Sequence, residues 1–162
     1  MSIIRKISQT EENLEQKDRK LNIVLTARER KKELMVRFCI AYRNIITCHN
    51  LFVTSEVSRA IEKLDLNLTV LLNGILGGYH QIFSKISCGE IDIVFFFRDT
   101  GKNWYSNQSE LELLRNCDFY NIPVATNLAT AEILIDRIAD KSLGCVLTNN
   151  NTKRRELDEF FY

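Results

Sequence analysis

The sequence lacks a charge of one dominant sign. It holds 22 Lys and Arg against 21 Asp and Glu, so its formal net charge at pH 7 is only +1. A chain without an excess of positive charge has no overall field to attract a nucleic acid or an anionic membrane. The sequence therefore predicts neither a nucleic-acid polymer nor a membrane as a partner, and an anionic ligand must be recognised at a local site.

Long apolar segments are absent as well. The most apolar stretch, residues 91–97, is interrupted by Asp92 and is far shorter than the ~20 residues that cross a membrane. Residues 1–20 are mostly polar and contain neither the apolar core nor the cleavage site of a secretory signal. These features predict a cytoplasmic protein without a transmembrane segment.

Proline, glycine and histidine are scarce, with one, six and two residues. So little Pro and Gly leaves no flexible interdomain linker, and we expect one domain over residues 21–150, a polar arm over residues 1–20 and a tail over residues 151–162. The five cysteines are odd in number and form no C-x-x-C pair, which argues against a disulfide framework and a metal site. We expect small buried cysteine side chains and no cofactor.

Short apolar runs alternate with segments of helical periodicity. The runs predict strands at residues 21–25, 51–53, 68–72, 91–97, 123–125 and 144–147. Apolar spacings of three and four predict helices at residues 27–43, 55–64, 79–87, 109–119 and 128–139, the fourth of them capped by Ser109-x-x-Glu112. Strands that alternate with helices form a parallel sheet covered on both faces, so we predict an α/β three-layer sandwich.

Ligands of such sheets bind beyond the carboxyl ends of the strands. Five segments follow predicted strands and are expected to form this edge: residues 26–31, 54–58, 73–80, 98–109 and 126–130. The glycine cluster at residues 73–78 would let backbone N–H groups approach an anion at the start of a helix. A simple tight turn is the alternative interpretation of these glycines, as a helix cap is for Thr54.

Ionisable residues in these segments are candidates for binding and proton transfer. Arg28, Arg30 and two lysines lie in the first turns of a predicted helix, where cations oppose the helix dipole unless an anion such as a phosphate meets them. A solvated charged surface is the alternative. Asp99 follows a buried strand and His80 follows the glycines, so each could transfer a proton or be purely structural.

The most distinctive segment is N-I-P-V-A-T-N-L-A-T-A at residues 121–131, which resembles the N-I-P-V-A-T-N-x-A-T-A signature of the methylglyoxal synthase family. Residues 88–99 resemble that family's E-G-K-I-D-x-x-I-F-F-x-D, and residues 73–81 resemble its S-G-P-x-G-G-D-Q-Q. The likeness is strong over residues 68–136 and weaker over residues 21–64. It implies a five-stranded parallel sheet and a homo-oligomer, which in this family is a hexamer.

Members of this family convert dihydroxyacetone phosphate to methylglyoxal and phosphate, using an Asp as base and a second Asp and a His as assistants. By the resemblance, the base corresponds to Tyr79, the His to Ser106 and the assisting Asp to Ser109. A phenol with a pKa of about 10 abstracts protons poorly at neutral pH. The resemblance therefore implies that the matched acid and base groups are lost.

The family's phosphate site is partly changed. The first Thr of its T-G-T-T-G motif is kept as Thr54, but the next becomes Glu56. The Ser before the first glycine corresponds to Asn73, the strand-end His to Thr26, and the phosphate-binding Lys to Arg30, which keeps the positive charge.

Together these features predict a non-catalytic protein that binds a phosphorylated small molecule, such as a nucleotide signal. The expected ligand-binding residues are Thr26, Arg30, Thr54, Glu56, Asn73, Gly74, Gly77, Gly78, Tyr79, Arg98 and Trp104. Of these, Tyr79, Arg98 and Trp104 would stack on a base. One alternative is a diverged methylglyoxal synthase in which Asp99 or His80 transfers the proton, and another is a structural subunit with a vestigial pocket.

Overall fold

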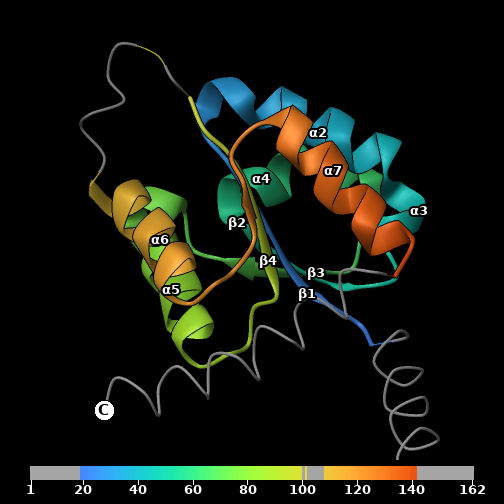
Figure 1. Ribbon diagram of the computed structural model, residues 1–162. Coiled ribbons are helices and arrows are strands. Elements are labelled where there is room, and N and C mark those ends of the chain that lie inside the picture. The colour runs from blue at the N-terminus through green and yellow to red at the C-terminus, as the bar shows by residue number, and fades with distance from the viewer. Residues whose placement is uncertain (1–18, 100, 102–107, 142–162) are drawn as a thin grey trace, which may run out of the picture. The chain divides into compact units, whose positions relative to one another are not determined.

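The computed structural model describes residues 19–99, 101 and 108–141. The described residues belong to two compact units, one formed by residues 20–133 and one that includes Arg19 and residues 134–141. The first unit holds five parallel strands, β1 (Asn22–Ala27), β2 (Asn50–Thr54), β3 (Leu68–Leu71), β4 (Ile93–Phe97) and β5 (Val124–Ala125). Their order in the sheet is β3-β2-β1-β4-β5 (Figure 1).

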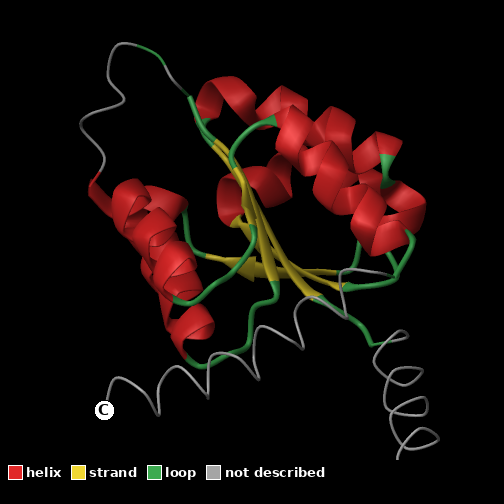
Figure 2. Ribbon diagram, viewed as in Figure 1, coloured by secondary structure: helices red, strands yellow, loops and turns green. Residues whose placement is uncertain are grey.

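The helices are α2 (Lys32–Ala41), α3 (Arg43–Ile46), α4 (Ser55–Ala60), α5 (Tyr79–Ser87), α6 (Gln108–Phe119) and α7 (Leu128–Ala139). Short helical turns occur at Glu29–Lys31, Glu62–Leu64 and Gly74–Gly78. In the unit formed by residues 20–133, α2 and α4 lie on one face of the sheet, and α5 and α6 lie together on the other (Figure 2). The predicted α/β three-layer sandwich with a five-stranded parallel sheet is confirmed.

Strand β4 shows why the sequence adopts this architecture. All five of its residues are buried, as expected for a strand covered on both faces. The ring of Phe38 in α2 lies 5.1 Å from that of Phe95 and 5.5 Å from that of Phe97. Phe96 points to the opposite face, where its ring lies 5.4 Å from that of Tyr79 in α5. The alternation of β4 side chains therefore holds one helical layer on each face.

Several predicted element boundaries are wrong. The helix expected over residues 55–64 ends as α4 at Ala60, and the strand expected over residues 91–97 begins at Ile93. The helix expected over residues 27–43 begins later, because β1 continues to Ala27, which pairs with Phe97 of β4, and α2 ends at Ala41. The cap expected at Ser109 is absent because α6 already begins at Gln108, whose side-chain amide donates a hydrogen bond of 3.2 Å to Glu112. Three predicted segments lie outside the described residues: the arm up to residue 18, the strand at residues 144–147 and the tail at residues 151–162.

The four cysteines in the described residues divide into two kinds, and Cys145 lies outside those residues. Cys39 and Cys117 are buried as expected, and burial raises the pKa of each thiol to about 12. Cys48 and Cys88 are exposed, so the expectation of burial is wrong for them. Cys48 lies in the turn between α3 and β2, and Cys88 directly follows α5, so both occupy connections rather than the core. Nothing in the described ranges indicates a helix long and apolar enough to span a membrane.

Candidate functional site

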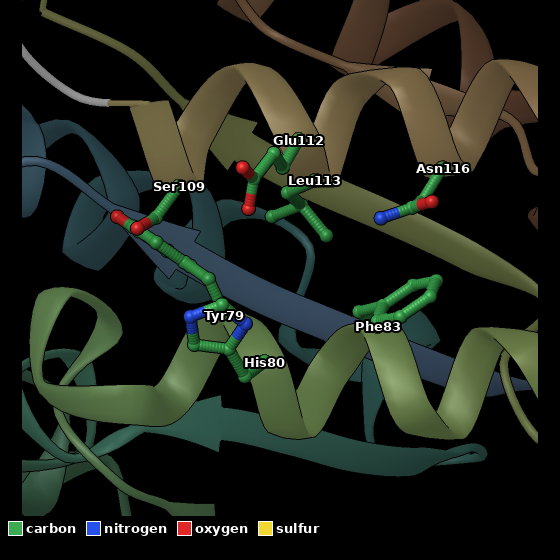
Figure 3. A pocket seen from close by; sticks show the side chains of 7 residues that line it. All are labelled: Tyr79, His80, Phe83, Ser109, Glu112, Leu113 and Asn116. Carbon is green, nitrogen blue, oxygen red and sulfur yellow. The ribbon is translucent and has the colours of Figure 1, made fainter.

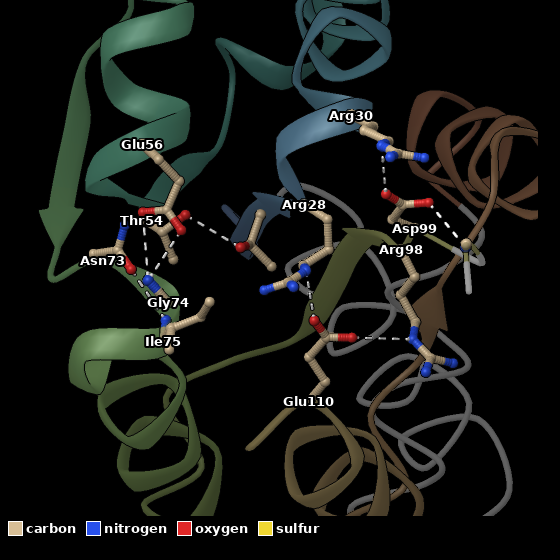
Figure 4. A network of polar contacts seen from close by, with 12 residues as sticks. Arg28, Arg30, Thr54, Glu56, Asn73, Gly74, Ile75, Arg98, Asp99 and Glu110 are labelled. Atoms are coloured by element: carbon tan, nitrogen blue, oxygen red, sulfur yellow. Dashed lines mark hydrogen bonds and ion pairs between the residues drawn. The ribbon is translucent and has the colours of Figure 1, made fainter. Parts of the chain in front are cut away.

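The carboxyl ends of the parallel strands lead to one polar edge of the sheet (Figure 4). Arg28 follows β1, Thr54 ends β2, and Arg98 and Asp99 follow β4. Parallel strands bring the residues that follow them to a common edge, where α/β proteins bind their ligands. The topology therefore places most of the predicted site residues along this edge.

A buried carboxylate, that of Glu110 near the start of α6, lies between two guanidinium groups. Arg28 Nε is 2.8 Å from Glu110 Oε1, and Arg98 Nε is 3.7 Å from Oε2. The Glu110 side chain is only 5% exposed, against 30% for Arg28 and 21% for Arg98. Burial raises the pKa of Glu110, an effect that Asp99 increases and the two arginines oppose. The edge thus holds a carboxylate that is both paired and poorly hydrated.

Sequence reasoning did not identify Glu110, although a signal was present. Glu110, Leu113 and Cys117 form the buried stripe of α6, with spacings of three and four. A glutamate at a core position of an amphipathic helix is rare unless it is paired. The same reasoning considered Arg28 only as one of several charges at a helix start, whereas its side chain reaches Glu110.

Arg30 and Asp99 form a second, weaker ion pair. Arg30 Nε lies 3.6 Å from Asp99 Oδ2, and Asp99 Oδ1 accepts a hydrogen bond of 3.0 Å from the backbone N–H of Gly101. The Arg30 side chain is 79% exposed, and an exposed pair of this kind contributes little to stability. Arg30 is therefore free to turn toward a ligand, while Asp99 already has two partners.

The glycine turn after β3 donates to a carboxylate within the protein. Both carboxylate oxygens of Glu56 accept from the backbone N–H of Gly74, at 3.0 and 3.3 Å. The side chain of Asn73 accepts from the N–H of Ile75 at 3.2 Å. Glu56 thus occupies the backbone donor that the sequence had suggested for an anionic ligand.

The other two glycines of the turn are required by its geometry. Gly77 has φ = +115°, which side-chain-bearing residues rarely adopt. A Cβ at Gly78 would lie 2.3 Å from the carbonyl oxygen of Leu72. The tight-turn interpretation therefore accounts for Gly77 and Gly78 without a ligand.

Tyr79 takes the place that the family resemblance gives to the catalytic base, and its side chain is buried. Only 2% of the residue is exposed, and its ring packs against Phe96 and the backbone of Gly74. Burial raises the pKa of Tyr79 to about 12; Glu110 and Glu56 add to the shift, and Arg28 opposes it. Tyr79 therefore stays protonated at neutral pH and has no exposed ring face for stacking.

Thr26 and Thr54 use their hydroxyls inside the sheet. Both residues are fully buried, and their Oγ1 atoms are 3.1 Å apart. This contact joins neighbouring strands β1 and β2 at their carboxyl ends. The two threonines fix the shape of the edge, and their hydroxyl groups are not exposed there.

A cavity of about 230 Å³ lies between α5 and α6 (Figure 3). It is lined by Tyr79, His80, Phe83, Ser109, Glu112, Leu113 and Asn116. The structure therefore brings His80 together with the two residues, Tyr79 and Ser109, that match the family's catalytic aspartates. Asp99, the other predicted proton-transfer residue, does not line this cavity.

Trp104 and Ser106 lie outside the described residues. Among those that the structure does describe, no three His, Cys, Asp or Glu side chains gather as a metal ion would require.

Comparisons with known proteins point to one family. The chain is 47% identical over 116 residues to a methylglyoxal synthase of Caldicellulosiruptor saccharolyticus, which covers 71% of this chain and 82% of that protein. It is 45% identical to a methylglyoxal synthase of a Thermoanaerobacter species, over 71% of this chain and 88% of that protein. A comparison with protein-family profiles found no match.

A solved structure agrees with these relatives. The crystal structure of a methylglyoxal synthase from Elizabethkingia anophelis superimposes with a TM-score of 0.67 at 32% sequence identity. The match covers 72% of this chain and 77% of the other.

Proposed function

Because this chain belongs to the methylglyoxal synthase family, we propose that it is a diverged methylglyoxal synthase, which binds a phosphorylated three-carbon substrate at the carboxyl edge of the sheet and eliminates phosphate from it. The sequence alone favoured a non-catalytic binding protein. The relatives, which share 45–47% of the aligned residues and are named methylglyoxal synthases, support the catalytic alternative instead.

The observation that carries this proposal is the buried carboxylate of Glu110 between Arg28 and Arg98. Elimination begins when the base takes a proton from the hydroxymethyl carbon beside the carbonyl group. The carbon–oxygen bond to phosphate then breaks, phosphate leaves, and the enol that remains takes up a proton on carbon to become methylglyoxal. Burial raises the pKa of the Glu110 carboxyl, and a carboxylate with a raised pKa is a stronger base for the first step than an ordinary one. The two guanidinium groups would stabilise the negative charge that develops on the substrate oxygen.

To bind the phosphate group of the substrate, the site needs a positively charged side chain that can turn toward it. Arg30 meets this requirement, since its side chain is largely exposed and its pair with Asp99 is loose. The N–H of Gly74 would become available if the phosphate displaced Glu56. We therefore propose Arg30, Asn73 and Gly74 as phosphate contacts. Thr26 and Thr54 would not touch the phosphate, but the contact between their hydroxyl groups would hold the strand ends in position.

A second candidate function, binding without turnover, is favoured by Tyr79. Its phenol stands where the family's base is expected and has a pKa of about 12. A protein with this substitution could hold the same phosphorylated ligand at the same edge and leave it unchanged.

The decisive experiment incubates the purified protein with dihydroxyacetone phosphate and measures methylglyoxal. Under the first proposal the wild type forms methylglyoxal, and Glu110→Gln lowers kcat by about 10²-fold or more, because it removes the base. Glu62→Gln, which makes the same change at an exposed position in the turn before β3, serves as the control and keeps its activity. Activity that survives Glu110→Gln would contradict the role of Glu110.

If the wild type is inactive but calorimetry shows that it binds dihydroxyacetone phosphate, binding without turnover becomes the supported function. In that case Tyr79→Asp, which returns the family's base, should produce activity. A protein that neither binds nor converts the compound would fit the structural-subunit hypothesis.

The assembly, location and nucleotide ligand suggested by the sequence stay predictions. Light scattering tests the first of them, since a mass near 18.9 kDa at micromolar concentration would contradict a homo-oligomer.

A further inference from the structure

The ion pairs around Glu110 leave part of the arginine charge unmatched. Arg28 and Arg98 together carry two positive charges, and Glu110 supplies one negative charge between them. Asp99, the next residue after Arg98, already pairs with Arg30 and the Gly101 N–H. The pair of guanidinium groups can therefore accept one more negative charge.

Arg98 also has an unused donor. Its Nε is buried, and no acceptor among the described residues lies within hydrogen-bond distance of it. Glu110 Oε2, at 3.7 Å, is close enough for an ion pair but too far for a hydrogen bond. A buried N–H without an acceptor is unfavourable, and a ligand oxygen would satisfy it.

We propose that Arg28 and Arg98 form a binding site for an oxyanion group of a ligand. In the structure the Glu110 carboxylate of the protein itself fills this oxyanion subsite. The ligand that this arrangement fits is a small molecule with two oxyanion groups, such as a phosphorylated carboxylic acid or a bisphosphate. One group would lie near Arg30, and the other would bind the two guanidinium groups. The inference rests on the proposed function for its location, because both concern the same edge of the sheet.

Occupancy of this subsite depends on the charge of Glu110. An ionised Glu110 competes with the external oxyanion for both guanidinium groups, whereas a neutral side chain does not. Arginine donates to an oxyanion through a planar pair of N–H groups, so a ligand carboxylate or phosphate can replace Glu110 with similar geometry.

The test uses sulfate as the probe and isothermal titration calorimetry as the readout. Glu110→Gln removes the competing charge and keeps the side-chain size, so sulfate should bind about tenfold more tightly than to the wild type, as expected when charge-assisted hydrogen bonds are gained. Glu62→Gln, the same change at an exposed position in the turn before β3, is the matched control and should leave sulfate affinity unchanged. Adding Arg98→Ala to Glu110→Gln should abolish the gain.

Unchanged or weaker sulfate binding by a folded Glu110→Gln protein would overturn the inference. If that variant fails to fold, the wild type provides the test, because sulfate keeps its charge while Glu110 titrates. The ionisable groups that face Glu110 are Arg28, Arg98, Asp99 and Tyr79. Affinity should rise as the pH falls through the pKa of Glu110, and Arg98→Ala should flatten this rise; an equal rise in both proteins would contradict the inference.

The sulfate measurement is independent of turnover. A wild type that forms no methylglyoxal would refute the proposed function and leave the subsite intact. Conversely, loss of activity in Glu110→Gln without any gain in sulfate affinity would refute the subsite and leave the proposed function standing.

Discussion

Substitution of Gly74 by Ala tests how closely Tyr79 fills the site at the strand edge. A Cβ at residue 74 would lie 2.6 Å from Cζ of Tyr79, 2.7 Å from Cε1 and 2.9 Å from the hydroxyl oxygen. Carbon atoms in favourable contact are ~3.5–4.0 Å apart, so the ring would have to move by roughly 1 Å. Phe96 packs beside that ring in a buried cluster, which resists such a shift. We expect Gly74→Ala to lower the free energy of unfolding by about 1–3 kcal/mol.

A second substitution turns this expectation into a thermodynamic cycle. Tyr79→Leu removes all three of the clashing atoms and keeps an apolar side chain. In the Tyr79→Leu protein, Gly74→Ala should lower the free energy of unfolding by less than about 1 kcal/mol. The difference between the two backgrounds is the interaction energy of residues 74 and 79, and it lies within the usual range for residues in contact. Urea unfolding of the four proteins measures it.

Gly78→Ala is the control for this cycle. Its Cβ would lie 2.3 Å from the Leu72 carbonyl oxygen and 2.9 Å from the Asn73 carbonyl carbon, obstacles that Tyr79→Leu does not remove. Its cost should therefore be the same in both backgrounds. If Gly74→Ala also costs the same in both, the close packing of Tyr79 against Gly74 is not what restricts residue 74, and the reasoning fails.

Three further predictions concern charge and exposure. Burial favours neutral Glu110 in the folded protein, so its contribution to stability is greatest below the ordinary Glu pKa of about 4.3 and is lost as pH rises through its higher folded-state pKa. Urea unfolding should show that the wild type loses stability relative to Glu110→Gln as the pH rises through this range. If the two free energies of unfolding differ by the same amount at every pH, the pKa of Glu110 is not raised. In calorimetric titrations with inorganic phosphate, Arg30→Ala should weaken binding about tenfold, whereas Arg37→Ala, a change at a similarly exposed arginine of α2, should not; equal effects would exclude Arg30 as an anchor. Iodoacetamide at pH 8 should alkylate the exposed cysteines and spare Cys39 and Cys117, as peptide mass spectrometry can check; rapid modification of either would show that it is not buried.

The sequence predicts the fold well because its strongest patterns are local. Residues 93–97 are apolar without exception, and Ile82 and Ile86 mark one face of a helix whose bounds, Tyr79–Ser87, match the prediction. The boundary after β1 was missed because Ala27 is held by its pairing with Phe97, seventy positions away in the numbering. Such pairing depends on the assembled sheet and leaves no trace in the periodicity of residues 27–43.

The site was harder to predict than the fold. Arg30, Glu56 and Asn73 could be selected because they follow strands that the pattern identifies. The role of Glu110 depends on Arg28 and Arg98, which follow two different strands, and no local spacing relates the three residues. The resemblance directed attention to Ser109, the matched position, and away from the carboxylate beside it.

The energetics of Glu110 argue that its burial serves more than stability. A buried ion pair seldom stabilises a protein more than well-packed apolar residues of similar volume, because both charges lose their hydration. The stripe that Glu110 shares with Leu113 and Cys117 could accept an apolar residue at its first position. Instead the chain keeps a poorly hydrated carboxylate close enough to Tyr79 to raise the pKa of the phenol. Ionisable groups held in this way cluster at functional sites, which supports the proposal that Glu110 supplies the base at this edge.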